Sequence, residues 1–139
     1  MLSFIKFIFG GVKLKVAVVG SRGLDFEIKR KYLPAGTTCV ISGGAAGVDK
    51  SAARLAKEYG LELKEYLPDY KRYGSRAPLI RNAEIIGKAD MIVAFWDGES
   101  RGTAYVINLC RKKEKPLIVY TVKNGHITDV KDENMPLRW

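Results

Sequence analysis

The chain has 139 residues, 47% of them hydrophobic and 28% charged, which predicts one globular domain and excludes an intrinsically disordered chain. Its two cysteines and single histidine exclude a disulfide-stapled scaffold and a histidine-based metal centre. The net charge of +9 favours anionic partners, although the excess of lysine and arginine is spread over both halves of the chain rather than gathered in a basic tail.

The first eleven residues carry six large apolar side chains, but this run is too short to span a bilayer and no A-x-A cleavage site follows it. We interpret it as an extra strand, an interface segment or the product of an upstream start codon. We therefore expect a cytoplasmic protein with no membrane partner, in which an exposed apolar N-terminus would form a homodimer contact.

Apolar, β-branched runs alternate along the chain with segments of helical spacing. The third helix is expected to turn Leu79, Ala83 and Ile86 inward, and Asn124-Gly125 predicts a hairpin. The predicted strands cover residues 14–19, 38–41, 61–67, 90–96 and 116–120, and the predicted helices cover 25–33, 47–59, 78–88 and 102–113.

This alternation predicts an α/β fold, a Rossmann-like parallel sheet of about five strands with helices on both faces and a hairpin-like C-terminal extension. We expect a single domain over residues 1–139, with a core at about 14–120 and peripheral extensions at 1–13 and 121–139.

The most informative segment is a glycine-rich turn between the second predicted strand and the following helix. Such a turn gathers backbone N–H groups at the positive end of a helix, where they suit a phosphate. Asp49 would either cap the first helical turn or hold a ribose hydroxyl. The alternative is that this segment is a tight turn between a strand and a helix and binds no ligand. The predicted ligand residues here are Ser42, Gly43, Gly44, Ala45, Gly47 and Asp49.

Three further loops, 20–23, 68–77 and 97–103, fall at the same edge, because ligands of open α/β sheets bind beyond the carboxyl ends of the strands. Arg81 and Asn82 stand beside these loops near the start of the third predicted helix, where they either contact the ligand or form a solvated face. Arg22 is either a bidentate phosphate ligand or a solvated surface charge. Trp96 either stacks on a base or covers the end of the sheet. The candidates from these loops and from the neighbouring helix and strand ends are Gly20, Ser21, Arg22, Arg81, Asn82, Trp96, Ser100, Gly102 and Thr103.

Together, Gly-Ser-Arg at 20–22, the 42–49 segment, Arg81-Asn82 and the Ser100…Gly102-Thr103 loop resemble the SLOG superfamily. That superfamily includes the DNA-processing protein Smf/DprA and the LONELY GUY phosphoribohydrolases, and the chain is most similar to the small YspA/YpsA-type members. The resemblance covers about residues 14–120. It implies a Rossmann-like fold whose glycine loops bind a nucleotide or a nucleotide-derived ligand.

Three functions follow as hypotheses. The first is a sensor or processing module for a nucleotide-like small molecule. The second is a phosphoribohydrolase-type N-glycosidase acting on nucleoside monophosphates, with Arg81 matching the family's arginine. The LONELY GUY loop P-G-G-x-G-T-x-x-E has no matching glutamate here, which leaves Asp97 or Glu99 as the catalytic carboxylate. The third is a single-stranded DNA-binding protein. We expect no required cofactor and no metal, apart from Mg²⁺ accompanying a polyphosphate ligand.

Overall fold

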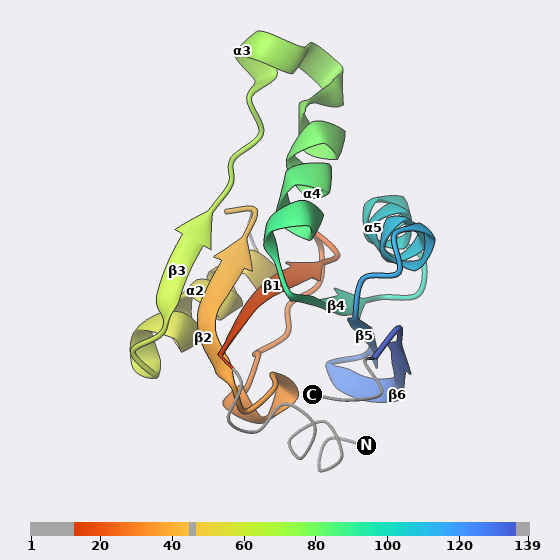
Figure 1. The fold of residues 1–139 in the computed structure, drawn as a ribbon. Coiled ribbons are helices and arrows are strands. Elements are labelled where there is room, and N and C mark those ends of the chain that lie inside the picture. Colours follow the sequence, from red (N-terminus) through yellow and green to blue (C-terminus); the bar gives the residue numbers. More distant parts are fainter. Residues whose placement is uncertain (1–12, 45–46, 136–139) are drawn as a thin grey trace.

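A computed structural model describes residues 13–44 and 47–135 (Figure 1). The strands are β1 Leu14–Gly20, β2 Thr37–Ser42, β3 Glu62–Glu65, β4 Met91–Trp96, β5 Leu117–Lys123 and β6 His126–Glu133. The helices are α2 Val48–Glu58, α3 Tyr70–Tyr73, α4 Ala77–Lys88 and α5 Arg101–Lys112, with 3₁₀ turns η1 Arg30–Tyr32 and η2 Gly74–Arg76. The alternation of strands and helices predicted from the sequence is confirmed.

The strands form one sheet in the order β3-β2-β1-β4-β5-β6, in which every pair is parallel except β5 and β6. From β1 the chain winds outward through β2 and β3, and then returns to place β4 on the other side of β1. The order therefore reverses between β1 and β4. A reversal of this kind opens a crevice at the carboxyl ends of the two strands, where α/β proteins bind their ligands.

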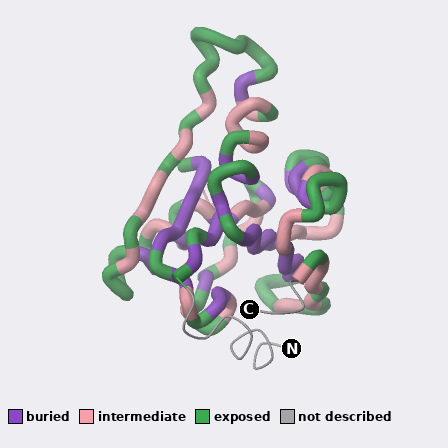
Figure 2. The backbone as a smooth tube through the Cα atoms, in the orientation of Figure 1, coloured by how far each residue is buried: buried purple, intermediate pink, exposed green. Residues whose placement is uncertain are grey.

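Helices cover both faces of the sheet, as expected (Figure 1). Alternate residues of β1 point to opposite faces: Val16 and Val18 pack with α2 on one face, and Ala17 packs with α4 and α5 on the other. The central strands are buried while the outer surfaces are exposed (Figure 2). Burial on both faces explains why these strands read as continuous apolar runs in the sequence.

The helix predicted over residues 25–33 is wrong. The segment is extended except for the single 3₁₀ turn η1, and its side chains alternate, with Phe26 and Ile28 packed inward and Asp25 and Glu27 exposed. The Ile28 N–H donates to Ser51 Oγ at 2.8 Å, which ties this segment to α2. The apolar residues here follow a period of two, and their burial on alternate positions replaces the expected helix.

Two other expectations change at the edges of the sheet. Leu79 is 44% exposed instead of inward, because the first turn of α4 projects beyond the sheet (Figure 1). The predicted hairpin is confirmed, with positive φ at Asn124 and Gly125, but β5 continues to Lys123 and β6 pairs with it along its length. The sheet thus has six strands, and part of the region expected to be peripheral is its antiparallel edge.

Candidate functional site

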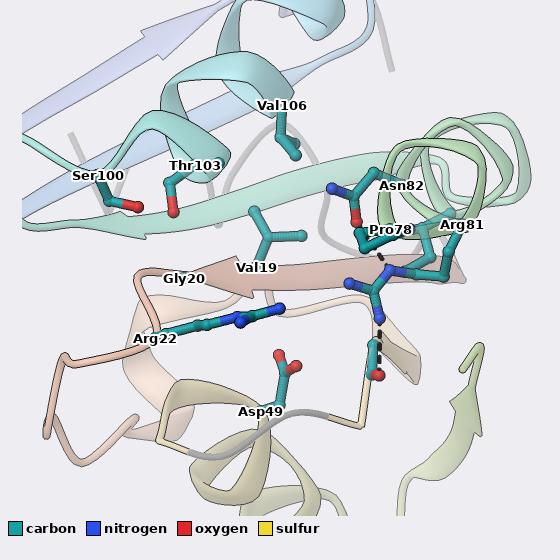
Figure 3. Close-up of a pocket in the computed structure, with 13 residues that line it drawn as sticks. Val19, Gly20, Arg22, Asp49, Pro78, Arg81, Asn82, Ser100, Thr103 and Val106 are labelled. Carbon is teal, nitrogen blue, oxygen red and sulfur yellow. Dashed lines mark hydrogen bonds between the residues drawn. The ribbon is translucent and has the colours of Figure 1, made fainter. Parts of the chain in front are cut away.

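A cavity of about 330 Å³ lies at the switch point between β1 and β4 (Figure 3). Its walls come from the end of β1, the loop after β2, the first turns of α2 and α5, and one face of α4. The lining residues are Val19, Gly20, Arg22, Gly43, Asp49, Pro78, Arg81, Asn82, Ile85, Ser100, Gly102, Thr103 and Val106. Nine of them were predicted from the sequence, and they come from three of the four predicted loops and from the third predicted helix; no residue of the loop 68–77 lines the cavity.

Arg81 is hydrogen-bonded to the glycine-rich loop after β2, which begins at Gly43. Its Nη1 donates to the carbonyl oxygens of Gly43 at 2.8 Å and Tyr66 at 3.3 Å, and its Nε donates to Asn82 Oδ1 at 2.8 Å. The other terminal nitrogen points across the cavity (Figure 3). Burial lowers the pKa of Arg81, and the nearby Asp49 carboxylate opposes that shift. An arginine keeps its charge near neutral pH, so Arg81 presents a fixed cation to the cavity.

Arg22 and Asp49 face each other across the mouth of the cavity (Figure 3). Arg22 is exposed and extends from the turn after β1, while Asp49 stands in the first turn of α2 with its carboxylate directed inward. Among the lining residues there are two arginines and one acidic side chain, so the balance of formal charge is positive. An anion that enters meets a guanidinium on each side.

Two helices begin at this cavity. Val48 starts α2 directly after Gly47, and Arg101 starts α5 directly after Ser100. Within the described part of the chain no side chain caps either helix. The first N–H groups of a helix have no partner inside the helix, and they carry the positive end of its dipole. Both helix starts therefore offer donors to an anion in the cavity.

Glycine is required at two positions by the packing around the cavity. A Cβ on Gly20 would lie 2.6 Å from the Val48 side chain, so the end of β1 approaches the first turn of α2 closer than any other residue allows. Gly47 has a φ of +72°, and a Cβ there would also lie 3.0 Å from the Leu24 carbonyl oxygen. These two contacts explain why glycines flank the start of α2.

Ser21 and Asp97 build the loop beneath the cavity. Ser21 is buried, and its Oγ lies 3.4 Å from Thr103 Oγ1 and accepts the Asp97 N–H at 3.3 Å. Asp97 Oδ1 in turn accepts the N–H groups of Ser100 at 2.7 Å and Glu99 at 2.8 Å. These bonds hold the pKa of Asp97 below its usual value. Asp97 therefore shapes the turn before α5.

Several predicted residues are placed outside the cavity wall. Trp96 donates from Nε1 to the Ser100 carbonyl at 3.1 Å and lines a separate cavity of about 230 Å³ beside β5 and β6. Ser42 is buried and its Oγ accepts the Gly44 N–H at 3.2 Å. Ala45 lies outside the described residues. Four other predicted residues also do not line the cavity: Gly44, Gly47, Asp97 and Glu99.

Four apolar lining residues were missed by the sequence analysis: Val19, Pro78, Ile85 and Val106. Helical spacing is the signal that would have found three of them. Pro78 and Ile85 lie three residues before and four residues after Arg81 on α4, and Val106 lies three residues after Thr103 on α5. They give the cavity an apolar surface, which on α4 flanks Arg81.

The described residues contain no group of three or more histidine, cysteine, aspartate or glutamate side chains placed to hold a metal ion. None of the helices in the described ranges is long and apolar enough to cross a membrane.

Comparison with known proteins gives one partial similarity. A stretch of 88 residues is 32% identical to an NADP-dependent mannitol dehydrogenase from Aureobasidium melanogenum, covering 61% of this chain and 33% of that enzyme. The chain thus spans about a third of the length of this curated relative. No family model matches the chain, and no solved structure matches it.

Proposed function

We propose that this protein binds a nucleotide or a nucleotide-derived phosphorylated ligand in the switch-point cavity, as a sensor or processing module. One observation carries the proposal: two helix starts without side-chain caps and two arginines meet at a single cavity. Each of these features alone is common, but together they concentrate positive potential and unpaired donors at one point.

The size and lining of the cavity suit such a ligand. A volume of about 330 Å³ falls at the lower end of the range for small-molecule sites, which is roughly 300–1,000 Å³. The phosphate would sit between the starts of α2 and α5, within reach of Arg81 and Arg22. The apolar wall formed by Pro78, Ile85 and Val106 would face the rest of the ligand.

Two similarities support the same ligand class. The residues that resemble the SLOG superfamily come from the four segments around the cavity, and we propose membership of that superfamily on this ground. The partial relative is NADP-dependent by name, and a nucleotide ligand would fit that likeness. The match covers only 33% of that enzyme and therefore does not extend to mannitol dehydrogenase activity.

Hydrolysis of an N-glycosidic bond is a second candidate, because Asp49 is the acidic side chain that lines the cavity. Acid–base work requires a carboxylate within hydrogen-bond reach of the reacting group. Asp49 is therefore a stronger candidate than Asp97 or Glu99. Release of free base from AMP by the wild-type protein, lost in Asp49→Asn while AMP binding persists, would establish this activity. Absence of base release at high protein concentration would reject it.

Binding is tested first by thermal shift against nucleoside mono- and triphosphates, cyclic nucleotides, NAD and ADP-ribose, with and without Mg²⁺. A ligand selective for the native state adds about 2.7 kcal/mol of stability at a hundredfold excess over Kd. Arg22→Ala should reduce this shift, because Arg22 lines the cavity. The matched control is Arg54→Ala, an exposed arginine of α2 outside the cavity lining. A flat response of the wild type to the whole panel would refute the proposal.

A further inference from the structure

β6 forms one edge of the sheet, and within the described ranges no strand pairs with its outer side (Figure 1). The N–H and C=O groups that an edge strand points away from its sheet are a ready template for another strand. β6 spans eight residues, whereas β3 at the opposite edge spans four. β6 therefore offers a partner chain the longer of the two edges.

β6 is fixed to the body of the protein and presents a regular edge. Arg111 of α5 donates from Nε to both carboxylate oxygens of Glu133, at 3.0 and 2.8 Å. The residues from Asp129 to Glu133 each pair with one residue of β5, and the register shifts before them, at Thr128, which has no partner in β5. The stretch from Asp129 onward is thus ordered in advance, which lowers the entropy cost of pairing with another chain.

Two opposite charges stand on one face of this edge. Asp129 and Lys131 are two residues apart, so their side chains leave the strand on the same side, and both line the cavity beside Trp96. Both are exposed, and neither side chain forms an ion pair or a hydrogen bond within the described part of the chain. At the same spacing in β3, Lys64 and Glu62 form an ion pair of 3.7 Å with each other. The charges of Asp129 and Lys131 remain available to a partner.

We propose that this edge binds the β6 strand of a second copy of the protein, antiparallel and across a twofold axis that passes through Val130. A twofold axis perpendicular to the sheet makes the interface self-complementary, so that each contact occurs twice. Side chains directly opposite each other share a face, which places such an axis at a residue position. With the axis at Val130, Asp129 of each copy lies opposite Lys131 of the other. The interface then contains two opposite-charge pairs.

The neighbouring registers are less favourable. An axis at Asp129 sets the two copies of this carboxylate opposite each other. An axis at Lys131 sets two lysines opposite each other and places Asp129 opposite Glu133. Like charges directly opposite each other destabilise a strand pair. Charged side chains on an edge commonly keep foreign strands away, and here the same charges match a second copy of β6 in the register centred on Val130.

The test is sedimentation equilibrium of the full chain over a concentration series, in which the wild type should dimerise. Asp129→Lys sets lysines opposite each other, and Lys131→Asp sets aspartates opposite each other. Either reversal should raise the Kd of the dimer by about 5- to 1,000-fold, because both pairs change from attraction to repulsion. The double variant restores both pairs and should dimerise like the wild type. An equimolar mixture of the two single variants should form a heterodimer, since each lysine of one then faces an aspartate of the other.

Asp25→Lys is the matched control, because it changes the net charge by the same amount as Asp129→Lys at an exposed position outside β6. It should dimerise like the wild type. The proposal is overturned if the wild type stays monomeric at every concentration, a result that leaves the edge to a different partner chain. It is also overturned if either single reversal dimerises as tightly as the wild type, which would place the interface elsewhere, or if the double variant or the mixture fails to associate.

Discussion

Gly102→Asp should separate stability from binding, because it strengthens a helix start and blocks an anion site at once. Gly102 is the second residue of α5 and lines the cavity, and a Cβ built on it meets no atom within 4 Å. Its replacement by alanine should raise the free energy of unfolding by about 0.5–1 kcal/mol, since glycine loses more backbone freedom in a helix. A carboxylate at a helix start adds about 0.3–1 kcal/mol, which offsets the lower helix propensity of aspartate.

Binding should change in the opposite direction. A carboxylate about 5 Å from a ligand phosphate, at an effective dielectric constant of about 20, costs about 3 kcal/mol, or roughly a hundredfold or more in affinity. The comparison is Gly102→Asp against Gly102→Ala, with urea unfolding for stability and AMP titration for binding. The alanine variant measures crowding by the added Cβ, and the further loss in the aspartate variant measures charge. Equal AMP affinity in the two folded variants would refute the placement of the phosphate at α5.

Three further predictions concern the body of the protein. Asp97→Asn should lower the free energy of unfolding at neutral pH, and the difference from the wild type should disappear in acid. The two N–H groups lower the folded-state pKa of Asp97 below 3.8, so the contribution of its carboxylate to stability is complete above pH 3.8 and is lost as the pH falls through the folded-state pKa. Urea unfolding midpoints measured from pH 7 to pH 2 would follow this loss. Tyr120→Phe should cost about 1–3 kcal/mol in urea unfolding, because it leaves the Tyr32 carbonyl, 2.9 Å from the buried hydroxyl, without its donor; an unchanged midpoint would show that this bond contributes nothing. Cys39 and Cys110 should stay unreactive toward a disulfide reagent at pH 8 until the protein unfolds, since both are buried and burial raises the pKa of Cys110 to about 12; rapid labelling of the native protein would contradict this.

The strands and three long helices could be predicted because their burial imposes a simple period on the sequence. The central strands are covered on both faces and so read as apolar runs. The helix predicted over 25–33 was wrong because a short segment can fit either period: Ile28 and Tyr32 are four residues apart, which matches one face of a helix as well as alternate positions of an extended chain. Contact with Ser51 of α2, far along the sequence, decides between the two.

The residues of the candidate site could be predicted from the sequence, but their roles could not. Glycines and arginines can be recognised as candidate ligand residues from their type alone, and nine of the predicted residues line one cavity. The role of a side chain depends on partners that the sequence does not reveal. Asp97 matched a catalytic carboxylate by type, but two backbone N–H groups in its own turn engage it.

The contact between Gly20 and Val48 has a consequence for how this cavity can change in evolution. A side chain at position 20 would meet Cβ, Cγ1 and Cγ2 of Val48, all between 2.6 and 2.7 Å away. Shortening Val48 to alanine would leave its Cβ in place, so only glycine at position 48 would make room, at the expense of the helix start that offers its donors to the cavity. Val48 therefore blocks the introduction of any side chain at position 20. Variation among descendants of this sequence should therefore spare position 20.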